Sequence, residues 1–355
     1  MRSLSAKINE QDVQQLAIEA NLPDDKLLAL VKSANYDTLL FSLADKIRRQ
    51  YYSDKVYLRG LIEITNYCKN NCYYCGIRAA NRNCIRYRLT KGEILACCQE
   101  GYELGFRTFV MQGGEDPYFT DEIICDIVAS IRERYPDCAI TLSLGERSYE
   151  SYKALYQAGA NRYLLRHESA AEQHYNQLHP KELSYQKRIE CLNALKEIGF
   201  QVGSGFMVGS PYQTAENLLA DLRFLQKLSP DMIGIGPFVH HKDTPFANCP
   251  NGTAELTLRM IAILRLLFPY ALLPSTTALG TIHPNGRELG LKAGANVVMP
   301  NLSPIAVRQK YELYDNKLYS GAESAQAIKE LKEKIAAIGY RAVSERGDVA
   351  RKILR

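Results

Sequence analysis

A regular alternation of two kinds of segment is the feature that most restricts the fold of this 355-residue chain. From about residue 55 onward, short apolar runs alternate with segments whose apolar side chains recur every three or four residues, the spacing of helices. Strands that alternate with helices are parallel, and eight such units close into a (β/α)8 barrel. An open doubly wound sheet or an incomplete barrel is the alternative. The expected strands are 56–65, 108–112, 139–144, 162–165, 201–208, 232–237, 272–276 and 296–299.

Local signals at the segment ends support the expected helices. Thr90, with Glu93 three residues later, predicts a capping box at the start of a helix. Gly159, Gly199 and Gly294 stand where a left-handed C-cap residue is expected. The expected helices of the barrel are 90–104, 121–135, 149–158, 184–198, 214–228, 253–267, 287–292 and 322–338.

The region before the first strand is expected to be helical as well. Apolar residues at helical spacing predict helices over 11–20, 24–33 and 36–50. We therefore predict an N-terminal helical cap over residues 1–54 and a (β/α)8 barrel over residues 55–340. A C-terminal tail over residues 341–355 completes the predicted division of the chain.

Composition excludes several classes of protein. The net charge is +5, but 44 Lys and Arg are spread among 39 Asp and Glu, so the balance indicates no nucleic acid partner. No apolar run approaches the length of a membrane span, and the polar start lacks the apolar core of a signal peptide. We therefore expect a cytoplasmic protein without a membrane partner, where close cysteines indicate metal ligands rather than disulfides.

Three of the ten cysteines stand close together after the first expected strand. Cys68, Cys72 and Cys75 have the spacing C-x3-C-x2-C, and barrel active sites lie at the C-terminal ends of the strands. Structural zinc normally has four ligands, and only Cys84, nine residues further on, offers a fourth. Three cysteines on a [4Fe–4S] cluster would leave one iron open. We expect the remaining cysteines to be small buried hydrophobic residues: Cys84, Cys97, Cys98, Cys125, Cys138, Cys191 and Cys249.

This cysteine loop, with Tyr74 directly before its last cysteine, resembles the signature of radical S-adenosylmethionine (SAM) enzymes. In that superfamily SAM chelates the open iron and is cleaved after one electron arrives from the cluster. The resemblance implies a [4Fe–4S] cluster held by Cys68, Cys72 and Cys75, with SAM as the second cofactor. Zinc, or three unrelated thiols, is the alternative.

The ends of other expected strands supply candidate SAM contacts. The turn Gln112-Gly113-Gly114-Glu115 follows the second strand, and its two glycines let a ligand approach the backbone closely. On the fifth and sixth strands, Met207 and Ile235 lie beside glycines and are candidate apolar walls of a ligand pocket. Tight barrel packing is the other explanation for those glycines. In the resembling superfamily the Gly-Gly-Glu turn binds the ammonium group of SAM.

Charged residues end the fourth expected strand. Burying Arg166 and Glu168 at the mouth of a barrel is costly unless they bind something. The resemblance implies that Glu168 holds the ribose or amino end of SAM and that Arg188 binds its carboxylate. Between them, His167 should point the opposite way along the strand, and we expect it to be structural.

Later segments narrow the resemblance. The stretches 162–168, 234–238, 276–282 and 295–301 resemble the HydE family of [FeFe]-hydrogenase maturases, and the likeness extends over roughly residues 40–345. This family is related to biotin synthase and to methylornithine synthase. Some members carry three further cysteines for a second cluster, but the matching stretch here, 311–326, contains none. We therefore expect a single cluster.

The resemblance implies a role in assembling the hydrogenase active-site cluster (the H-cluster). The expected substrate is a small iron–cysteine complex that bears CO and cyanide. We expect the substrate to contact hydroxyl groups at the end of the seventh strand and further side chains of the barrel interior: Thr276, Thr277, Met299, Tyr311 and Tyr314. The implied partners are other hydrogenase maturases and a flavodoxin or ferredoxin as electron donor. A mutase or sulfur-inserting enzyme acting on an amino acid is the enzymatic alternative, and an iron–sulfur carrier is the non-catalytic one.

Overall fold

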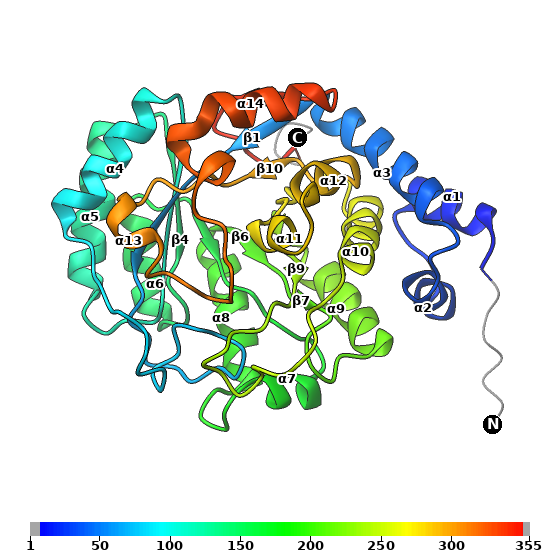
Figure 1. The fold of residues 1–355 in the computed structure, drawn as a ribbon, viewed down its shortest axis with the longest axis horizontal. Helices are drawn as coiled ribbons and strands as arrows, with labels where there is room; N and C mark the ends of the chain where they lie inside the picture. Colours follow the sequence, from blue (N-terminus) through cyan, green and yellow to red (C-terminus); the bar gives the residue numbers. More distant parts are fainter. Residues whose placement is uncertain (1–7, 351–355) are drawn as a thin grey trace.

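A ring of parallel strands forms the centre of the structure, a computed structural model that describes residues 8–350 (Figure 1). Six strands form one continuous sheet with parallel neighbours throughout. In order they are β2 (Gly60–Thr65), β3 (Thr108–Gly113), β4 (Ala139–Ser143), β5 (Arg162–Leu164), β6 (Gln201–Ser204) and β8 (Met232–Ile233).

Short pairings close this sheet into a barrel. β8 pairs with Leu272, and Pro274 pairs with β10 (Val297–Val298). β10 pairs in turn with β1 (Lys55–Leu58), which leads directly into β2. The ring is therefore complete, and the predicted (β/α)8 barrel is confirmed over an open sheet.

Four expected strands differ in detail from the structure. The segment 56–65 is divided into β1 and β2 at Arg59. The segments 201–208 and 232–237 are each interrupted, and their ends form a separate two-stranded sheet of β7 (Met207–Val208) and β9 (Gly236–Pro237). The segment 272–276 keeps only its two single pairings, because Pro274 has no N–H to donate to a neighbouring strand.

The expected position of Thr276 and Thr277 at the end of a strand was therefore wrong. Thr276 is the N-cap residue of a short helix, α11 (Thr277–Ile282), that the sequence did not predict. Two other short helices, α7 (Glu172–Leu178) and α13 (Ile305–Arg308), were also unexpected. Each of the three lies in a connection at the strand C-terminal ends or in the segment that follows the last strand.

The longer helices cover the outside of the ring (Figure 1). The capping box of Thr90 and Glu93 is present, and Gly159, Gly199 and Gly294 have φ angles of 114°, 105° and 112°, as predicted for left-handed C-caps. The helices are α4 (Lys91–Glu103), α5 (Asp121–Arg134), α6 (Tyr149–Gln157), α8 (Tyr185–Ile198), α9 (Ala215–Leu228), α10 (Ala254–Leu267), α12 (Gly286–Lys292) and α14 (Ile328–Ala337).

The last helix begins later than the predicted 322–338. The backbone before Ile328 bonds instead to the barrel: Asn301 N–H donates to the Glu323 carbonyl at 2.8 Å, and Ala325 N–H donates to the Asn301 carbonyl at 3.0 Å. Those groups are therefore not available to an α-helix. Two 3-10 turns occupy this stretch, η1 (Gly321–Glu323) and η2 (Ala325–Ala327).

Three N-terminal helices pack along one side of the barrel (Figure 1): α1 (Glu10–Glu19), α2 (Asp24–Lys32) and α3 (Asp37–Tyr52). α3 packs on α10 and α2 packs on α9. A bidentate ion pair ties the cap to the barrel, since Arg259 Nε and Nη2 donate to the Asp37 carboxylate at 2.6 and 2.9 Å. The first seven residues of the predicted cap lie outside the described residues.

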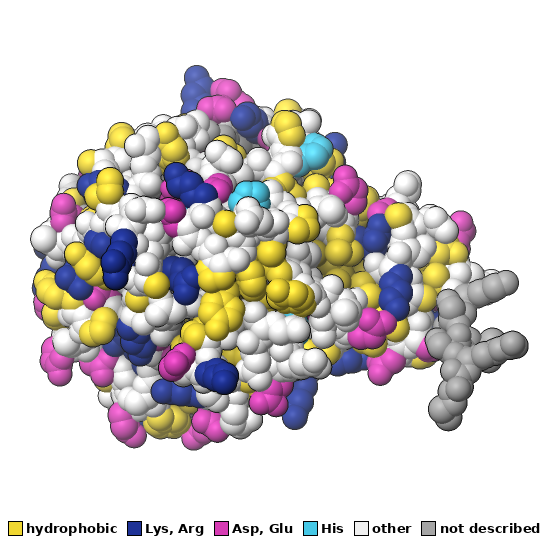
Figure 2. Space-filling model, turned by 60° about the horizontal axis from the view of Figure 1, so that its bottom comes forward, with side chains coloured by type: hydrophobic (Ala, Val, Ile, Leu, Met, Phe, Trp, Pro, Cys, Tyr) yellow, Lys and Arg dark blue, Asp and Glu magenta, His cyan; other side chains and the backbone are white. Residues whose placement is uncertain are grey.

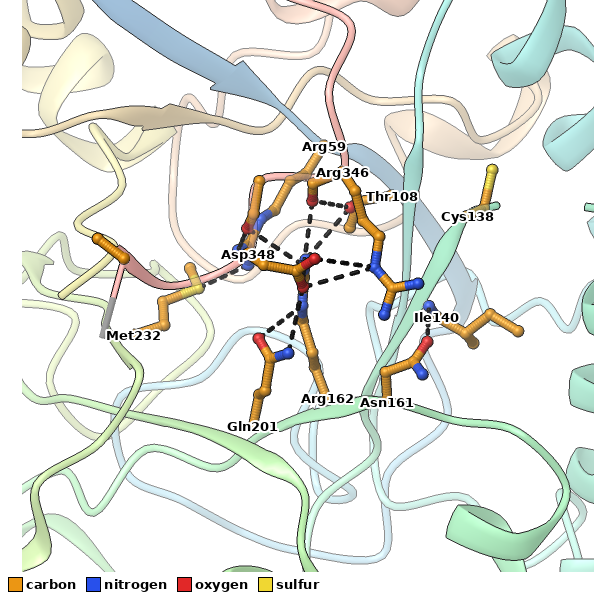
Figure 3. Close-up of polar contacts among 12 residues, drawn as sticks. Arg59, Thr108, Cys138, Ile140, Asn161, Arg162, Gln201, Met232, Arg346 and Asp348 are labelled. Carbon is orange, nitrogen blue, oxygen red and sulfur yellow. Dashed lines mark hydrogen bonds and ion pairs between the residues drawn. The ribbon is translucent and has the colours of Figure 1, made fainter. Parts of the chain in front are cut away.

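The C-terminal segment closes the floor of the barrel, so the predicted tail 341–355 does not extend away from the barrel where it is described (Figure 3). β11 (Arg341–Val343) pairs with β1. Beyond it, the Gly347 carbonyl accepts hydrogen bonds from Arg59 Nη2 at 3.4 Å and from Arg162 Nη2 at 3.1 Å. Residues 351–355 of the predicted tail lie outside the described residues.

Asp348 is the acidic group of this floor. Burial alone would raise the pKa of Asp348, but the charge of Arg162 and hydrogen bonds from Arg162 (2.8 Å) and Gln201 (3.1 Å) lower it to about 2. Such a shift corresponds to about 2 kcal/mol of stability. Because 37% of the side chain is exposed, solvent screening reduces the expected contribution to about 1 kcal/mol.

We expect Asp348→Asn to lower the free energy of unfolding by this amount at pH 7. Since the folded-state pKa lies below the unfolded-state value, the stabilisation is present above about pH 4 and is lost as the pH falls towards 2. Urea unfolding of wild type and variant at pH 7 and at about pH 2.5 checks this, and the difference should shrink at the lower pH. An equal difference in the free energy of unfolding at both pH values would contradict the stabilising role of the Asp348 carboxylate.

The surface shows mixed charge and no membrane-spanning element. On the face in Figure 2, Lys and Arg side chains are interspersed with Asp and Glu, and hydrophobic side chains gather near the middle. That face therefore has no continuous basic track for a polyanion. Within residues 8–350, no helix is long and apolar enough to cross a bilayer.

Candidate functional site

The three predicted ligands lie on the loop that follows β2, at the mouth of the barrel. Cys68, Cys72 and Cys75 are all partly buried and unpaired. Contacts from other loops hold this segment: Lys69 N–H donates to the Glu115 carbonyl at 2.9 Å, and Gly76 N–H donates to the Leu313 carbonyl at 2.8 Å. The loop shape is therefore set by neighbouring strand ends as well as by its own sequence.

The side chain of Arg86 holds the cysteine loop in place, and this contact was not predicted. The Arg86 guanidinium donates to four backbone carbonyls of the cysteine loop and its continuation: those of Asn66, Ile77, Arg78 and Asn81. Five donors in a fixed fork suit arginine to this task. Nothing in the local sequence distinguishes Arg86 from its basic neighbours, so only the folded loop reveals it.

The environment of the thiols fits a cluster. Burial raises the pKa of Cys72 to about 12 and that of Cys75 well above its ordinary value, and the neighbouring thiols raise both further. Burial also raises the pKa of Cys68, although backbone N–H groups of Asn70 and Glu115 donate to its sulfur. Three such buried thiolates become favourable only where positive charge compensates them, as cluster iron does.

The arrangement fits a cluster better than a single metal ion. Within residues 8–350, no three His, Cys, Asp or Glu side chains converge closely enough to hold one ion. The cysteines of a [4Fe–4S] cluster each bind a different iron, so they need not converge. The Gly-Gly turn beside the loop leaves no room for larger residues, because a Cβ on Gly114 would stand 2.2 Å from the Tyr67 carbonyl oxygen and 2.7 Å from Cys68 Cβ.

The rest of the predicted Gly-Gly-Glu turn is tied to its surroundings. Gln112 Nε2 donates to the Tyr311 hydroxyl at 3.3 Å, which joins two predicted site residues. Glu115 Oε1 accepts from Glu146 N–H at 3.0 Å, and Glu115 Oε2 lies 3.3 Å from Lys69 Nζ. The carboxylate of Glu115 thus holds the loop after β4. Gly113 ends β3 beside this turn.

The predicted Arg166, Glu168 and Arg188 come together after β5. Arg188 Nη1 donates to the Arg166 carbonyl at 2.7 Å, and Arg166 Nη2 lies 3.6 Å from Glu168 Oε2. The partner of Arg188 was not predicted: Glu146 Oε1 accepts from Arg188 Nε at 2.5 Å, and both side chains are buried. Although burial alone would lower the pKa of Arg188, Tyr175 and Glu146 raise it, so the guanidinium stays charged.

Several of these side chains have unused hydrogen-bonding capacity. Arg166 Nε and Nη2, Glu168 Oε2 and Thr276 Oγ1 are buried atoms that have no hydrogen-bond partner within residues 8–350. Buried polar atoms of this kind are uncommon and need a partner. They lie on residues that follow β5 and on the N-cap residue of α11, so a polar ligand at the mouth of the barrel would satisfy them.

The apolar predicted residues lie in two different hydrophobic clusters. Met207 is buried in a cluster with Phe238 against which Tyr74 packs. The Tyr74 hydroxyl lies 3.1 Å from His179 Nε2, a contact that the sequence did not predict. Ile235 belongs to the main core of the barrel. Tight packing explains one strand glycine, because a Cβ on Gly205 would stand 2.0 Å from the Gly234 carbonyl oxygen.

The predicted substrate residues lie in different surroundings within the barrel. Thr277 Oγ1 donates to Glu323 Oε2 at 2.8 Å, and Glu323 also pairs with Arg287. Tyr311 is buried, and burial raises the pKa values of both Tyr311 and Tyr314. Met299 instead packs against the apolar cluster near the barrel floor that contains Leu272 and Val297.

A buried ion pair beside Tyr311 was not predicted. Glu63 on β2 is fully buried, and Lys317 pairs with its carboxylate while donating to the Tyr311 carbonyl at 2.9 Å. Asn301 Nδ2 donates to Glu63 Oε2 at 2.8 Å. Glu63 interrupts an otherwise apolar strand, and this was the signal available in the sequence.

Comparison with known proteins agrees with this geometry. Residues 62–225 match the model of the Radical SAM superfamily. The chain is 47% identical over 288 residues to the [FeFe] hydrogenase maturase subunit HydE of Thermotoga maritima, covering 81% of this chain and 82% of that protein. It is 29% identical to a 3-methylornithine synthase of Methanosarcina acetivorans over 84% of each chain.

Solved structures support the same fold. The crystal structure of methylornithine synthase (PylB) superposes with a TM-score of 0.82 at 26% identity, covering 93% of this chain and 97% of that one. The hydrogenase maturase HydG superposes with a TM-score of 0.79 over 95% of this chain and 77% of its own, but at 19% identity it supports the fold alone.

The closed barrel, the three-cysteine loop after β2 and the superfamily match together define a radical SAM enzyme. Its chemistry is the one-electron reductive cleavage of SAM, with a [4Fe–4S] cluster and SAM as cofactors. Within this superfamily, the chain belongs to the HydE family of [FeFe]-hydrogenase maturases.

Proposed function

We propose that Cys68, Cys72 and Cys75 hold the cluster and that the turns after β3 and β5 hold SAM. Glu168 and Arg166 would bind the polar end of SAM, and Arg188 would bind its carboxylate or keep Arg166 in place through the Arg166 carbonyl. Gly113 and Gly114 would let this turn pack closely against Thr65 and the cysteine loop, since a Cβ on either glycine would meet those residues. Tyr74, Met207 and Ile235 would exclude water from the apolar side of the site.

One observation supports this assignment most directly. Arg166, Glu168 and Thr276 keep buried polar atoms without hydrogen-bond partners in the described part of the chain, and Arg166 Nη2 lies 3.6 Å from Glu168 Oε2. Glu168 is a residue for which the resemblance implies a SAM contact, Arg166 is the candidate binding residue two positions before it, and Thr276 is an expected substrate contact. A ligand with both a charged amino-acid end and further polar groups satisfies that set.

We further propose that the substrate is a small iron–cysteine complex with CO and cyanide, used in H-cluster assembly. Its anionic ligands would accept a hydrogen bond from Thr276 Oγ1, which is free to donate. Thr277 is already engaged with Glu323, so its role would be to orient that carboxylate. Tyr311 and Tyr314 would line the interior, and Met299 would contribute only through packing.

The partner proteins and the cellular location are inferred from the same family. Other hydrogenase maturases would supply the substrate and receive the product, and a flavodoxin or ferredoxin would supply the electron. We place the protein in the cytoplasm, in keeping with the reducing conditions that an exposed cluster needs.

The experiment that tests the substrate measures 5′-deoxyadenosine from reconstituted, dithionite-reduced protein. SAM is supplied with or without the iron–cysteine complex made by a partner maturase. Product that increases sharply with the complex supports the maturase substrate. The mutase alternative is supported by the likeness to methylornithine synthase. It would be favoured if 5′-deoxyadenosine formation did not depend on the complex but increased with ornithine- or lysine-type amino acids.

Replacing Glu168 tests the SAM contact. We expect Glu168→Gln to retain its cluster but to raise the KM for SAM by about 10- to 100-fold, the worth of a hydrogen bond to a charged group. Glu172→Gln is the matched control, because Glu172 is exposed four residues further on. Iron content and the dependence of 5′-deoxyadenosine formation on SAM measure the two effects. A normal KM for SAM in Glu168→Gln would contradict the contact.

A further inference from the structure

A buried aspartate on α9 holds both sides of the turn that carries Glu168. Asp221 is completely buried, and its Oδ1 atom lies 3.2 Å from His167 Nε2 and accepts from Ala170 N–H at 2.5 Å. His167 immediately precedes Glu168, and Ala170 follows it by two residues. A single oxygen therefore fixes the turn on either side of the proposed SAM-binding residue.

The imidazole of His167 is held from a second direction. His167 Nδ1 lies 3.0 Å from Ser204 Oγ on β6. The ring packs against Phe206 and Phe224, with centroids 5.7 and 4.7 Å away. Because both nitrogens have partners and two aromatic rings pack against the imidazole, its position is well defined.

The connection Ser204–His167–Asp221 has the order of a hydrolase triad, but its burial excludes that chemistry. The three residues are 3%, 0% and 0% exposed, so no substrate reaches the hydroxyl. A positioning role remains for these residues. The residue that they position lies between His167 and Ala170, and it is Glu168.

Glu168 has a conformation that needs such support. Its φ angle is 62°, in the left-handed region that residues with a Cβ disfavour. Its N–H donates to the Gly205 carbonyl at 3.1 Å, and its Oε2 atom keeps no hydrogen-bond partner within the described residues. Strained conformations of this kind persist where the surroundings over-determine them, and they cluster at ligand sites.

We propose that His167 and Asp221 are positioning residues that hold Glu168 in its left-handed conformation, with its carboxylate at the barrel mouth ready for SAM. The inference rests on the proposed contact between Glu168 and SAM. Because His167 is anchored in the core directly before Glu168, the left-handed backbone at Glu168 sets the direction of its carboxylate. Neither His167 nor Asp221 would touch SAM itself.

Two substitutions at Asp221 distinguish the effect of its hydrogen-bond acceptor from the effect of its side-chain volume. Asp221→Leu keeps a side chain of similar size but leaves His167 Nε2 and Ala170 N–H without an acceptor. Asp221→Asn keeps an amide oxygen at the same position. His167→Phe, which keeps the ring contacts and removes both nitrogens, provides the same test if Asp221→Leu does not fold.

The first readout needs neither cofactor. Hydrogen exchange of the peptide covering 166–171 in cluster-free protein should become faster in Asp221→Leu and stay near wild type in Asp221→Asn. The second readout is steady-state kinetics of the reconstituted enzyme. Asp221→Leu should raise the KM for SAM by about tenfold or more with kcat changed less than about threefold, and Asp221→Asn should recover most of the affinity.

Asp37→Asn is the control for general loss of stability, since it breaks an ion pair that is remote in sequence and belongs to the N-terminal cap. It should leave both readouts unchanged. If Glu168→Gln raises the KM for SAM but Asp221→Leu changes neither exchange nor KM, the positioning role is wrong and the SAM contact stands. If Glu168→Gln has no effect on the KM, the SAM contact fails, and the positioning role toward SAM fails with it.

Discussion

Replacement of Cys72 by alanine is expected to remove the [4Fe–4S] cluster and to abolish SAM cleavage while the barrel remains folded. Two cysteines cannot complete the three-ligand set. Replacing residues that only support metal ligands already lowers metal affinity or activity by about 10- to 100-fold, so we expect SAM cleavage to fall by more than about 100-fold. Only one residue of a loop already held by Arg86 is changed, so the barrel should persist. Iron and sulfide content, the EPR spectrum of the reduced protein and 5′-deoxyadenosine formation measure the outcome.

Cys84→Ala is the matched control for this prediction. Cys84 is nine residues from Cys75 and is the alternative fourth ligand by spacing alone. In the structure its sulfur lies 3.5 Å from Asn66 Nδ2, a contact outside the three-cysteine set. Cys84→Ala should keep a normal cluster content. A Cys72→Ala protein that retained a four-iron signal responsive to SAM would overturn the assignment of the ligands.

Gly114→Ala should be almost as damaging, although it changes no functional group. A Cβ at this position would stand 2.2 Å from the Tyr67 carbonyl oxygen and 2.7 Å from Cys68 Cβ, and the first of these is backbone that cannot rotate away. The cysteine loop would have to move, carrying Cys68 with it. We expect cluster content after reconstitution to fall at least about tenfold, because ligand positions tolerate only small errors.

The control for this substitution is Gly92→Ala on α4. A Cβ on Gly92 meets only the Thr90 hydroxyl, at 3.9 Å, so it has room. Alanine also favours a helix over glycine, and Gly92→Ala should be neutral or slightly stabilising. Iron content and the thermal midpoint of both variants give the comparison. A Gly114→Ala protein with a full cluster would show that the loop is not held against this turn.

Much of the architecture was predictable because it depends on signals that are local in sequence. Parallel strands and covering helices follow from side-chain period, and the helix ends from residues such as Thr90 and Gly199. Departures occurred where distant backbone groups competed. Asn301 takes the hydrogen bonds that would extend α14, and Pro274 reduces a strand to single pairings.

The candidate site divides in the same way. The cysteine spacing and the residues at strand ends were readable, because a barrel brings the ends of all its strands to one mouth. The sequence by itself thus determined the fold class, the three-cysteine loop and the candidate residues at the ends of several strands. Which of those residues already have partners was not readable, and this changes their proposed roles: Glu115 and Thr277 are engaged, whereas Glu168 and Thr276 have unused capacity.

Only the tertiary structure decided how these residues are held. Arg188 on α8 pairs with Glu146 on the loop after β4, and His167 contacts Asp221 on a helix more than fifty residues away in sequence. Pairings of this kind depend on the register of the strands and on the rotation of each helix over the barrel. Those quantities are set by the packing of the whole core, so no local pattern of residues encodes them.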